Sequence, residues 1–152
     1  MAENKQYTLG IDIGSTTAKL VACLDGKIVY SRYERHMSRV RERTAELLRE
    51  MEAELGNVTV TAAISGSAGL GVAEAAELPF IQEVAATTEL VRRYHPDTEA
   101  VIELGGEDAK IIFFGSGIDE RMNGTCAGGT GAFIDQMATL LGISVDELDR
   151  LS

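Results

Sequence analysis

The pattern of apolar and polar positions at the start of the chain predicts three consecutive strands. The first spans residues 7–13, and a tight glycine turn leads from it into a second strand at residues 19–24. Asp25-Gly26 is a strong hairpin signal, and residues 27–33 supply the third strand. These elements together predict an antiparallel meander.

The pattern then changes to helical spacing. Apolar positions between residues 39 and 55 predict an amphipathic helix, and residues 58–65 form a mostly apolar strand of the buried kind. A second glycine loop follows at residues 65–71 and leads into a short helix. Another helix is predicted over residues 83–94, so the chain is expected to be an α/β protein.

The beginning of the chain recurs near its middle. A shift of 91 residues lays residues 11–21 on residues 102–112, with an acid on an acid at Asp12 and Glu103. Glycine, alanine and lysine recur in the same register, as does the glycine of the hairpin that follows. A repeat of this length predicts two related lobes, each opening with a strand, an acidic residue, a glycine turn and a second strand.

The repeat sets the expected domain organisation. The first lobe is predicted over residues 1–95, and the start of a second lobe over residues 96–152. The second copy has predicted strands at residues 111–114 and 118–122, and a capping box, Ser144 with Glu147, opens its last helix. Since the first copy needs about 95 residues to complete, we expect this chain to be the front part of a longer polypeptide.

A glycine loop at residues 123–131 leads into the predicted helix of the second copy. Four glycines in nine residues exclude a packed strand or helix interior. Cys126 is therefore expected at or just before the helix N-terminus, where the helix dipole favours a thiolate that is a nucleophile or a metal ligand. The alternative is a small residue buried in a tight loop. Helical spacing follows at Phe133, Ile134, Met137, Ala138 and Leu141.

Composition narrows the possible partners. The net charge is −10, with 24 acidic against 14 basic residues, which argues against nucleic acids and anionic membrane surfaces. No apolar run approaches the roughly 20 residues of a membrane span, so we expect a cytoplasmic protein. Cys23 and Cys126 form no disulfide framework, and Cys23, within an apolar run, is predicted to belong to the core.

The two acidic turns have the chemistry of a nucleotide site with Mg²⁺. Asp12 and Glu103 can hold the metal directly or through water and can orient an attacking water molecule. Glycine lets the backbone approach phosphate, and hydroxyl and lysine side chains add donors. Neither turn is a Walker loop. The candidate nucleotide ligands are Gly14, Ser15, Thr16, Thr17 and Lys19 in the first turn and Gly105, Gly106, Glu107, Asp108 and Lys110 in the second.

These motifs carry a family resemblance. Residues 12–19 and 103–110 resemble the phosphate motifs of the actin, sugar kinase and heat-shock chaperone ATPase superfamily. Residues 123–133 resemble, more narrowly, the activators of 2-hydroxyacyl-CoA dehydratases and the ATPase subunits of benzoyl-CoA reductases. The resemblance covers the chain from Tyr7 onward. It implies ribonuclease H-like lobes that bind ATP or ADP with Mg²⁺ and change their relative angle on hydrolysis.

The resemblance also implies a redox function. Such proteins are homodimers that share one [4Fe-4S] cluster, take an electron from a donor such as ferredoxin or flavodoxin, and pass it to a CoA-ester dehydratase or reductase. Cys126 matches a cluster ligand of the family. The second ligand and the adenosine-binding segment of the family lie further along than Ser152. Residues 1–152 are therefore expected to bind nucleotide weakly and not to assemble the cluster alone.

Two other functions remain open from the residues themselves. An actin-like kinase would use the same turns to transfer phosphate to a small molecule, although no substrate motif stands out and the cysteine loop would have no role. A non-catalytic nucleotide-sensing module within a larger assembly is the third reading. A cluster together with ATPase activity would support the activator, and phosphate transfer without a cluster would support the kinase.

Overall fold

The computed structural model describes residues 6–115, 117–123 and 128–151. The chain divides into two compact units, residues 1–88 and residues 89–152, and each is treated by itself below. The element order in both units is the α/β order that the sequence predicts. Cys126 lies outside the described residues.

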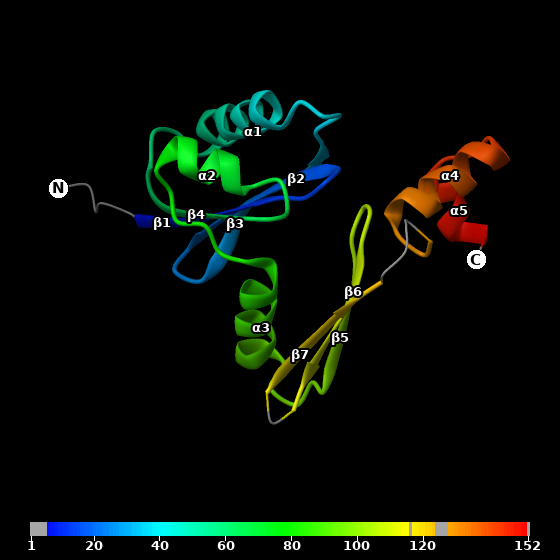
Figure 1. The fold of residues 1–152 in the computed structure, drawn as a ribbon. Coiled ribbons are helices and arrows are strands. Elements are labelled where there is room, and N and C mark those ends of the chain that lie inside the picture. The colour runs from blue at the N-terminus through cyan, green and yellow to red at the C-terminus, as the bar shows by residue number, and fades with distance from the viewer. Residues whose placement is uncertain (1–5, 116, 124–127, 152) are drawn as a thin grey trace. The chain divides into compact units, whose positions relative to one another are not determined.

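The first unit is built on a four-stranded mixed sheet (Figure 1). β1 (Gln6–Ile13), β2 (Thr17–Leu24) and β3 (Lys27–Arg35) form the predicted antiparallel meander, and β4 (Thr59–Ser65) adds to β1 in parallel, giving the order β3-β2-β1-β4. The parallel pairing follows from the helical crossover between β3 and β4.

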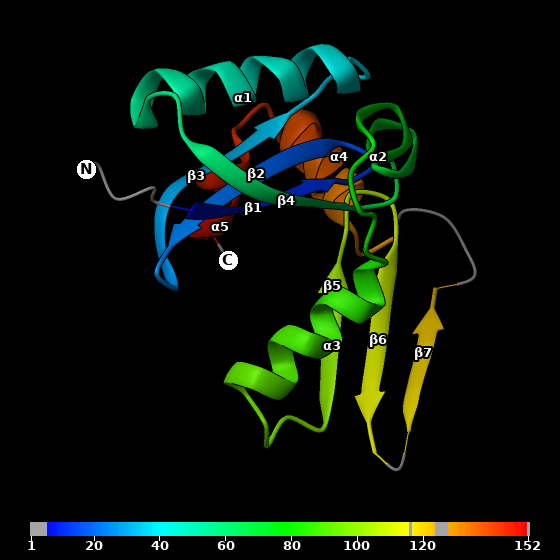
Figure 2. The same ribbon diagram turned by 90° about the vertical axis from the view of Figure 1, so that its left-hand side faces the viewer.

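Helices cover one face of this sheet. α1 (Val40–Leu55) lies across the strands, as Figure 2 shows, and α2 (Leu70–Ala76) shares a single apolar core with it. α3 (Glu83–Tyr94) has the predicted bounds and does not belong to this layer, since it spans the division between the two units. The buried side chains of the core come from alternate positions of the strands, because successive side chains point to opposite faces. They include Leu9, Ile11, Ile13, Ala18, Leu20 and Ala22.

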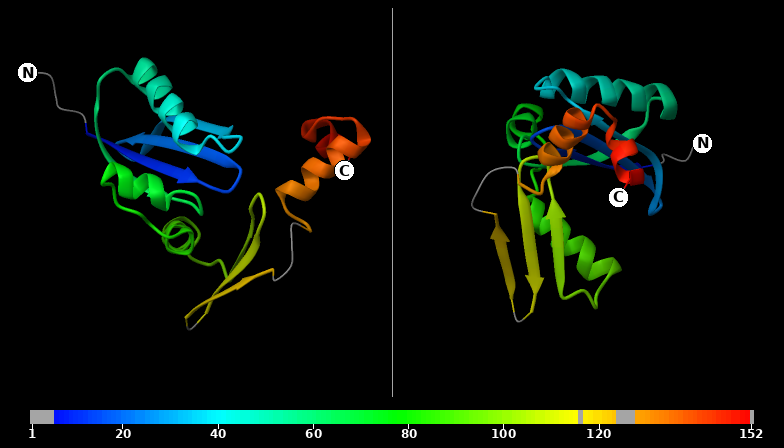
Figure 3. Two further views of the ribbon diagram at one scale, coloured as in Figure 1. Left: turned by 45° about the horizontal axis from the view of Figure 1, so that its top comes forward. Right: turned by 90° about the vertical axis from the view of Figure 1, so that its right-hand side faces the viewer.

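The second unit contains a three-stranded antiparallel meander in the order β5-β6-β7, seen in the right panel of Figure 3. Its strands are β5 (Ala100–Leu104), β6 (Ala109–Phe114) and β7 (Ile118–Met122), and its helices are α4 (Gly131–Leu141) and α5 (Val145–Leu151).

The repeat inferred from the sequence is present in the strand registers. Asp12 pairs with Lys19 across β1 and β2, and Glu103 pairs with Lys110 across β5 and β6. Both second strands begin earlier than predicted, β2 at Thr17 and β6 at Ala109, because the turns are tighter than the glycine content suggests.

The N-terminus of α4 follows the predicted glycine loop. The helix begins at Gly131, five residues after Cys126, with an extended Thr130 as its N-cap. Gly129 has a φ of 80° in the left-handed region, so the chain is not yet helical there. The prediction that Cys126 stands at or just before the helix start concerns a residue outside the described ones, and it stays a prediction. No helix among the described residues is long and apolar enough to cross a membrane.

Candidate functional site

The first acidic turn is held closed by its own backbone. The Gly14 amide donates to the Thr17 carbonyl at 2.9 Å, which directs the chain from β1 back into β2. Thr17 is buried at the start of β2, whereas Ser15 and Thr16 are half-buried at the tip. The turn therefore offers two hydroxyl side chains and a compact backbone to a ligand.

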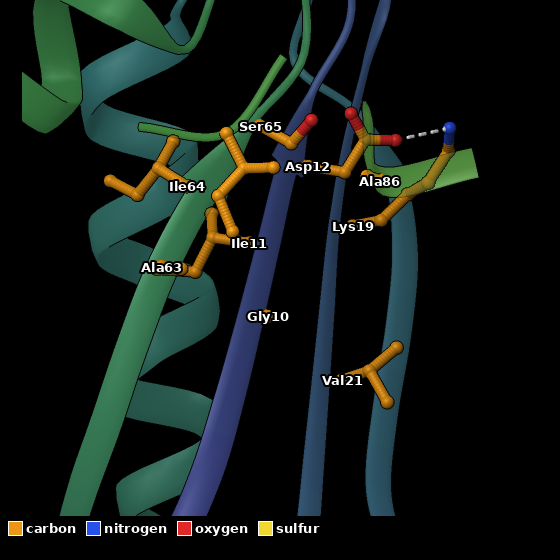
Figure 4. A pocket seen from close by; sticks show the side chains of 10 residues that line it. Gly10, Ile11, Asp12, Lys19, Val21, Ala63, Ile64, Ser65 and Ala86 are labelled. Atoms are coloured by element: carbon orange, nitrogen blue, oxygen red, sulfur yellow. Dashed lines mark hydrogen bonds and ion pairs between the residues drawn. The ribbon is translucent and has the colours of Figure 1, made fainter. Parts of the chain in front are cut away.

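Asp12 lies near the end of β1, just before the turn, on the face of the sheet opposite α1. Its Oδ2 accepts a 2.7 Å ion-pair hydrogen bond from Lys19 Nζ, which Figure 4 shows as a dashed line between neighbouring strands. Lys19 Nζ also lies 5.3 Å from the centre of the Tyr33 ring. Both partners are more than a third exposed, so water screens the pair and a ligand can compete for either charge.

A hollow of about 310 Å³ lies beside this ion pair in the first unit. Small side chains on the exposed face of β1 and β4 leave the space, which is apolar except at the end where Asp12 and Lys19 stand (Figure 4). The lining residues include Gly10, Val21, Ala63, Ser65, Ile81 and Ala86.

The second acidic turn repeats the backbone of the first. The Gly105 amide donates to the Asp108 carbonyl at 2.8 Å, and Lys110 Nζ lies 4.0 Å from Glu103 Oε1. Lys110 is more enclosed than Lys19, with 12% of its side chain exposed. The tip carries exposed carboxylates at Glu107 and Asp108, so this turn suits a cation better than a bare phosphate.

One oxygen of Glu103 fits a metal ion. Its Oε2 is buried and has no hydrogen-bond partner within the described residues. A buried carboxylate oxygen without a partner is costly, and a cation removes that cost. No group of three or more His, Cys, Asp or Glu side chains in the described part of the chain gathers to hold a metal without other ligands. Mg²⁺ is commonly bound by one or two carboxylates together with phosphate and water, so the Glu103 carboxylate can take part in such a site.

The start of α4 is hydrogen-bonded to the second turn. The amides of Gly131 and Ala132 donate to the carbonyls of Gly105 and Gly106, at 3.0 and 2.8 Å. Two of the first amides of the helix are thus used by the second turn. The segment that follows Cys126 is consequently tied to the turn that carries the candidate metal ligand.

The glycine loop after β4 contributes to the first turn more closely than the sequence indicates. The Ala68 amide donates to the Ile13 carbonyl at 2.9 Å, and a side chain at Gly66 would stand 2.2 Å from that carbonyl oxygen and 2.6 Å from Asp12 Oδ1. Glu83 accepts from the Ser67 amide at 3.1 Å. The Ser-Gly-rich loop at the end of a buried strand was the available signal for this contribution.

Comparison with solved structures identifies the fold. The activator of 2-hydroxyisocaproyl-CoA dehydratase from Clostridium difficile, solved with bound ADPNP, superposes with a TM-score of 0.79 at 29% identity, over 93% of this chain and 55% of the activator chain. The fold is that of the actin-like ATPases, as the resemblance implied.

The sequence comparisons define the family. The model of the BadF/BadG/BcrA/BcrD ATPase family matches residues 9–152, and the chain belongs to this family. The (R)-2-hydroxyglutaryl-CoA dehydratase activating ATPase of Acidaminococcus fermentans is 29% identical over 149 residues, which cover 95% of this chain and 57% of that protein. The 2-hydroxyisocaproyl-CoA dehydratase activator of Clostridioides difficile is 30% identical over 96% of this chain and 56% of its own length. The chain thus spans a little over half the length of these relatives.

Proposed function

We propose that the protein carrying this chain is an ATP-dependent activator that couples ATP hydrolysis to electron transfer from a [4Fe-4S] cluster to a CoA-ester dehydratase or reductase. The observation that carries the nucleotide part is the pair of acidic turns with the same register and the same closing hydrogen bond. Family membership and relatives that activate CoA-ester dehydratases support the partner class.

The proposed roles in nucleotide binding divide between the two turns. Gly14, Ser15 and Thr16 would present amide and hydroxyl donors to phosphate, with Lys19 released from Asp12 when the ligand binds. Asp12 and Glu103 would hold Mg²⁺ and orient the attacking water. The metal supplies positive charge that neutralises the phosphate oxygens.

The other candidate ligands have lesser proposed roles. The backbone of Gly105 and Gly106 would contact phosphate, and the position of Thr17 suits support of the turn more than direct contact. Glu107 and Asp108 would reach the nucleotide through metal-bound water, because carboxylates repel phosphate at close range. Lys110 would counter the charge of Glu103 while the metal is absent.

We propose Cys126 as a ligand of the cluster. A [4Fe-4S] cluster normally needs four thiolates, so a two-fold homodimer supplies two from each chain. The described residues give no distances to such a cluster, because Cys126 is not among them. Support for coupling comes from the hydrogen bonds between the second turn and the start of α4, since a shift of the turn would be transmitted to the segment after Cys126.

We further propose that the two units correspond to the first lobe and the beginning of the second lobe of the ATPase. A soluble electron donor such as ferredoxin or flavodoxin would reduce the cluster in the cytoplasm.

ATP hydrolysis by the protein that carries this chain tests the nucleotide part. Asp12→Asn and Glu103→Gln should each lower kcat/KM at least about 100-fold, because each removes a carboxylate that orients water or metal. Asp25→Asn and Glu120→Gln are matched controls on exposed positions of the same meanders and should leave activity unchanged. Full activity in both site variants would refute the proposed roles.

An anaerobic preparation tests the redox part. The unmodified protein should show the broad visible absorption of an iron–sulfur cluster, and Cys126→Ser should lose it while Cys23→Ser keeps it. Absence of a cluster together with phosphate transfer to a small molecule would favour the kinase, and nucleotide binding without hydrolysis would favour the sensing module.

A further inference from the structure

A buried histidine in the first unit holds the nucleotide turn. His36 is 5% exposed and follows β3 directly. Its Nε2 lies 3.0 Å from the Gly14 carbonyl, and its own backbone amide donates to the Thr16 carbonyl at 3.1 Å. One residue thus bonds two carbonyls of the same turn.

The other ring nitrogen fixes the proton position. Nδ1 of His36 accepts a hydrogen bond from the Ser38 amide at 3.2 Å, so it carries no proton. The proton of the neutral ring is therefore on Nε2, which donates to Gly14. The side chain consequently links the turn of β1–β2 to the start of α1.

The backbone next to His36 is strained. Met37 and Ser38 have φ values of 47° and 61°, in the left-handed region that non-glycine residues rarely adopt. The Arg39 amide closes this turn on the His36 carbonyl at 2.7 Å. Such strain persists where the surrounding structure enforces it, often at functional sites.

The second unit holds its turn at the equivalent atom by another means. The shift of 91 residues carries Gly14 to Gly105, whose carbonyl accepts the Gly131 amide, also at 3.0 Å. In both units, the segment leading into the next helix bonds the carbonyl of the first turn glycine. The first unit uses a side chain for this contact and the second unit uses the main chain.

We propose that His36 is a positioning residue that keeps the Gly14–Thr17 turn in the conformation that receives the nucleotide phosphates. This inference rests on the proposed function of the turn. His36 touches no reacting atom, so its loss should weaken nucleotide binding and leave the chemical step intact.

Two substitutions separate the two ring nitrogens. In His36→Gln, the side-chain amide keeps a donor at about the position of Nε2. In His36→Asn, the shorter side-chain amide keeps an acceptor at about the position of Nδ1. His36→Asn should raise the KM for ATP about tenfold with kcat within about twofold, since one hydrogen bond to a buried carbonyl is lost. His36→Gln should stay within about twofold of the unmodified protein. His95→Asn, at an exposed position, is the matched control.

Ser38→Gly removes the strain at position 38 of the neighbouring turn and tests a purely structural role. It should restore stability to His36→Asn without restoring its KM. A merely structural role would reduce the fraction of active protein, which lowers kcat at unchanged KM. That result, or an equal rise of KM in His36→Gln and His36→Asn, would overturn the proposal.

Amide hydrogen exchange without nucleotide separates this inference from the proposed function. His36→Asn should speed exchange at the Gly14 amide, and unchanged exchange would overturn the holding role. Faster exchange with an unaltered KM would overturn the role in nucleotide binding. If the unmodified protein binds no ATP, the proposed function fails and the nucleotide role of His36 fails with it, while exchange still decides whether His36 holds the turn.

Discussion

The two meanders of this protein share a turn but not a core. The first buries β1 and β2 side chains on one face, with Ile11 4% and Ile13 0% exposed. The shift of 91 residues carries these positions to Ile102 and Leu104, which are 69% and 62% exposed. Identical register and turn hydrogen bonds therefore accompany opposite degrees of burial. Strand pairing is decided locally, whereas burial depends on which helix covers the sheet.

The chemistry at the turn tips also differs between the meanders. Thr16 and Thr17 of the first turn correspond to Glu107 and Asp108 of the second. Hydroxyls can donate to phosphate, and carboxylates bind cations or metal-bound water. The duplicated backbone thus supports two different sets of ligand contacts.

Paired truncations at equivalent positions test the difference in burial. Ile11→Ala should lower the free energy of unfolding of the first unit by about 2–5 kcal/mol, because it leaves a cavity under α1. Ile102→Ala should change stability by no more than about 0.5 kcal/mol, as at other exposed sites. Chemical denaturation followed by hydrogen exchange in each unit measures both values. An equal cost at Ile102 would show that an apolar partner covers that face in the protein.

A glycine substitution tests the close contact between the loop after β4 and the first turn. Among the described residues, only the first turn has such a loop against it. Gly66→Ala should cost about 2–4 kcal/mol, because its φ of 98° disfavours a side chain and the added carbon would overlap the Ile13 carbonyl. It should also abolish nucleotide binding by displacing the loop beside Asp12.

Gly26→Ala is the matched control for this substitution. Gly26 has a φ of 74° but no atom within 4 Å of the added carbon, so only the backbone cost of about 1–2 kcal/mol applies. Thermal unfolding and ATP titration distinguish the two variants. Similar losses in both would mean that backbone strain, and not the contact with Ile13, dominates at Gly66.

Local patterns in the sequence were sufficient for the elements and for the repeat. The bounds of α3 and β7 agree with the prediction. The pairing of Asp12 with Lys19 and of Glu103 with Lys110 follows from the repeated spacing. These features depend on neighbours in sequence and on short turns, which the pattern of residues encodes directly.

Contacts between segments far apart in the sequence could not be predicted in the same way. Nothing near His36 in sequence shows that its ring bonds Gly14, 22 residues away. The approach of Gly66 to Asp12 depends on the parallel pairing of β4 with β1, which brings two loops to the same sheet edge. A run of glycines likewise does not show which of them has a positive φ, as Gly129 has before α4.

Two glutamates offer the mildest test of how the units differ. The hydrogen bond from Arg43 lowers the pKa of Glu46 on α1 below the ordinary value of 4.5, with help from neighbouring arginine charges. The pKa of Glu147 is lowered instead by hydrogen bonds from the amide and hydroxyl of Ser144, in the predicted capping box.

The sign of the pH effect is the same for both glutamates. Because each pKa is lower in the folded state, the stabilisation is present above pH 4.5 and is lost as the pH falls through the folded pKa. Salt separates the two causes, since it screens charges but not a hydrogen bond from a neutral group. High salt should therefore raise the pKa of Glu46 and leave the pKa of Glu147 unchanged. NMR titration at low and high salt measures both values. Ser144→Ala should raise the pKa of Glu147 alone, and an equal response of both glutamates to salt would contradict this division.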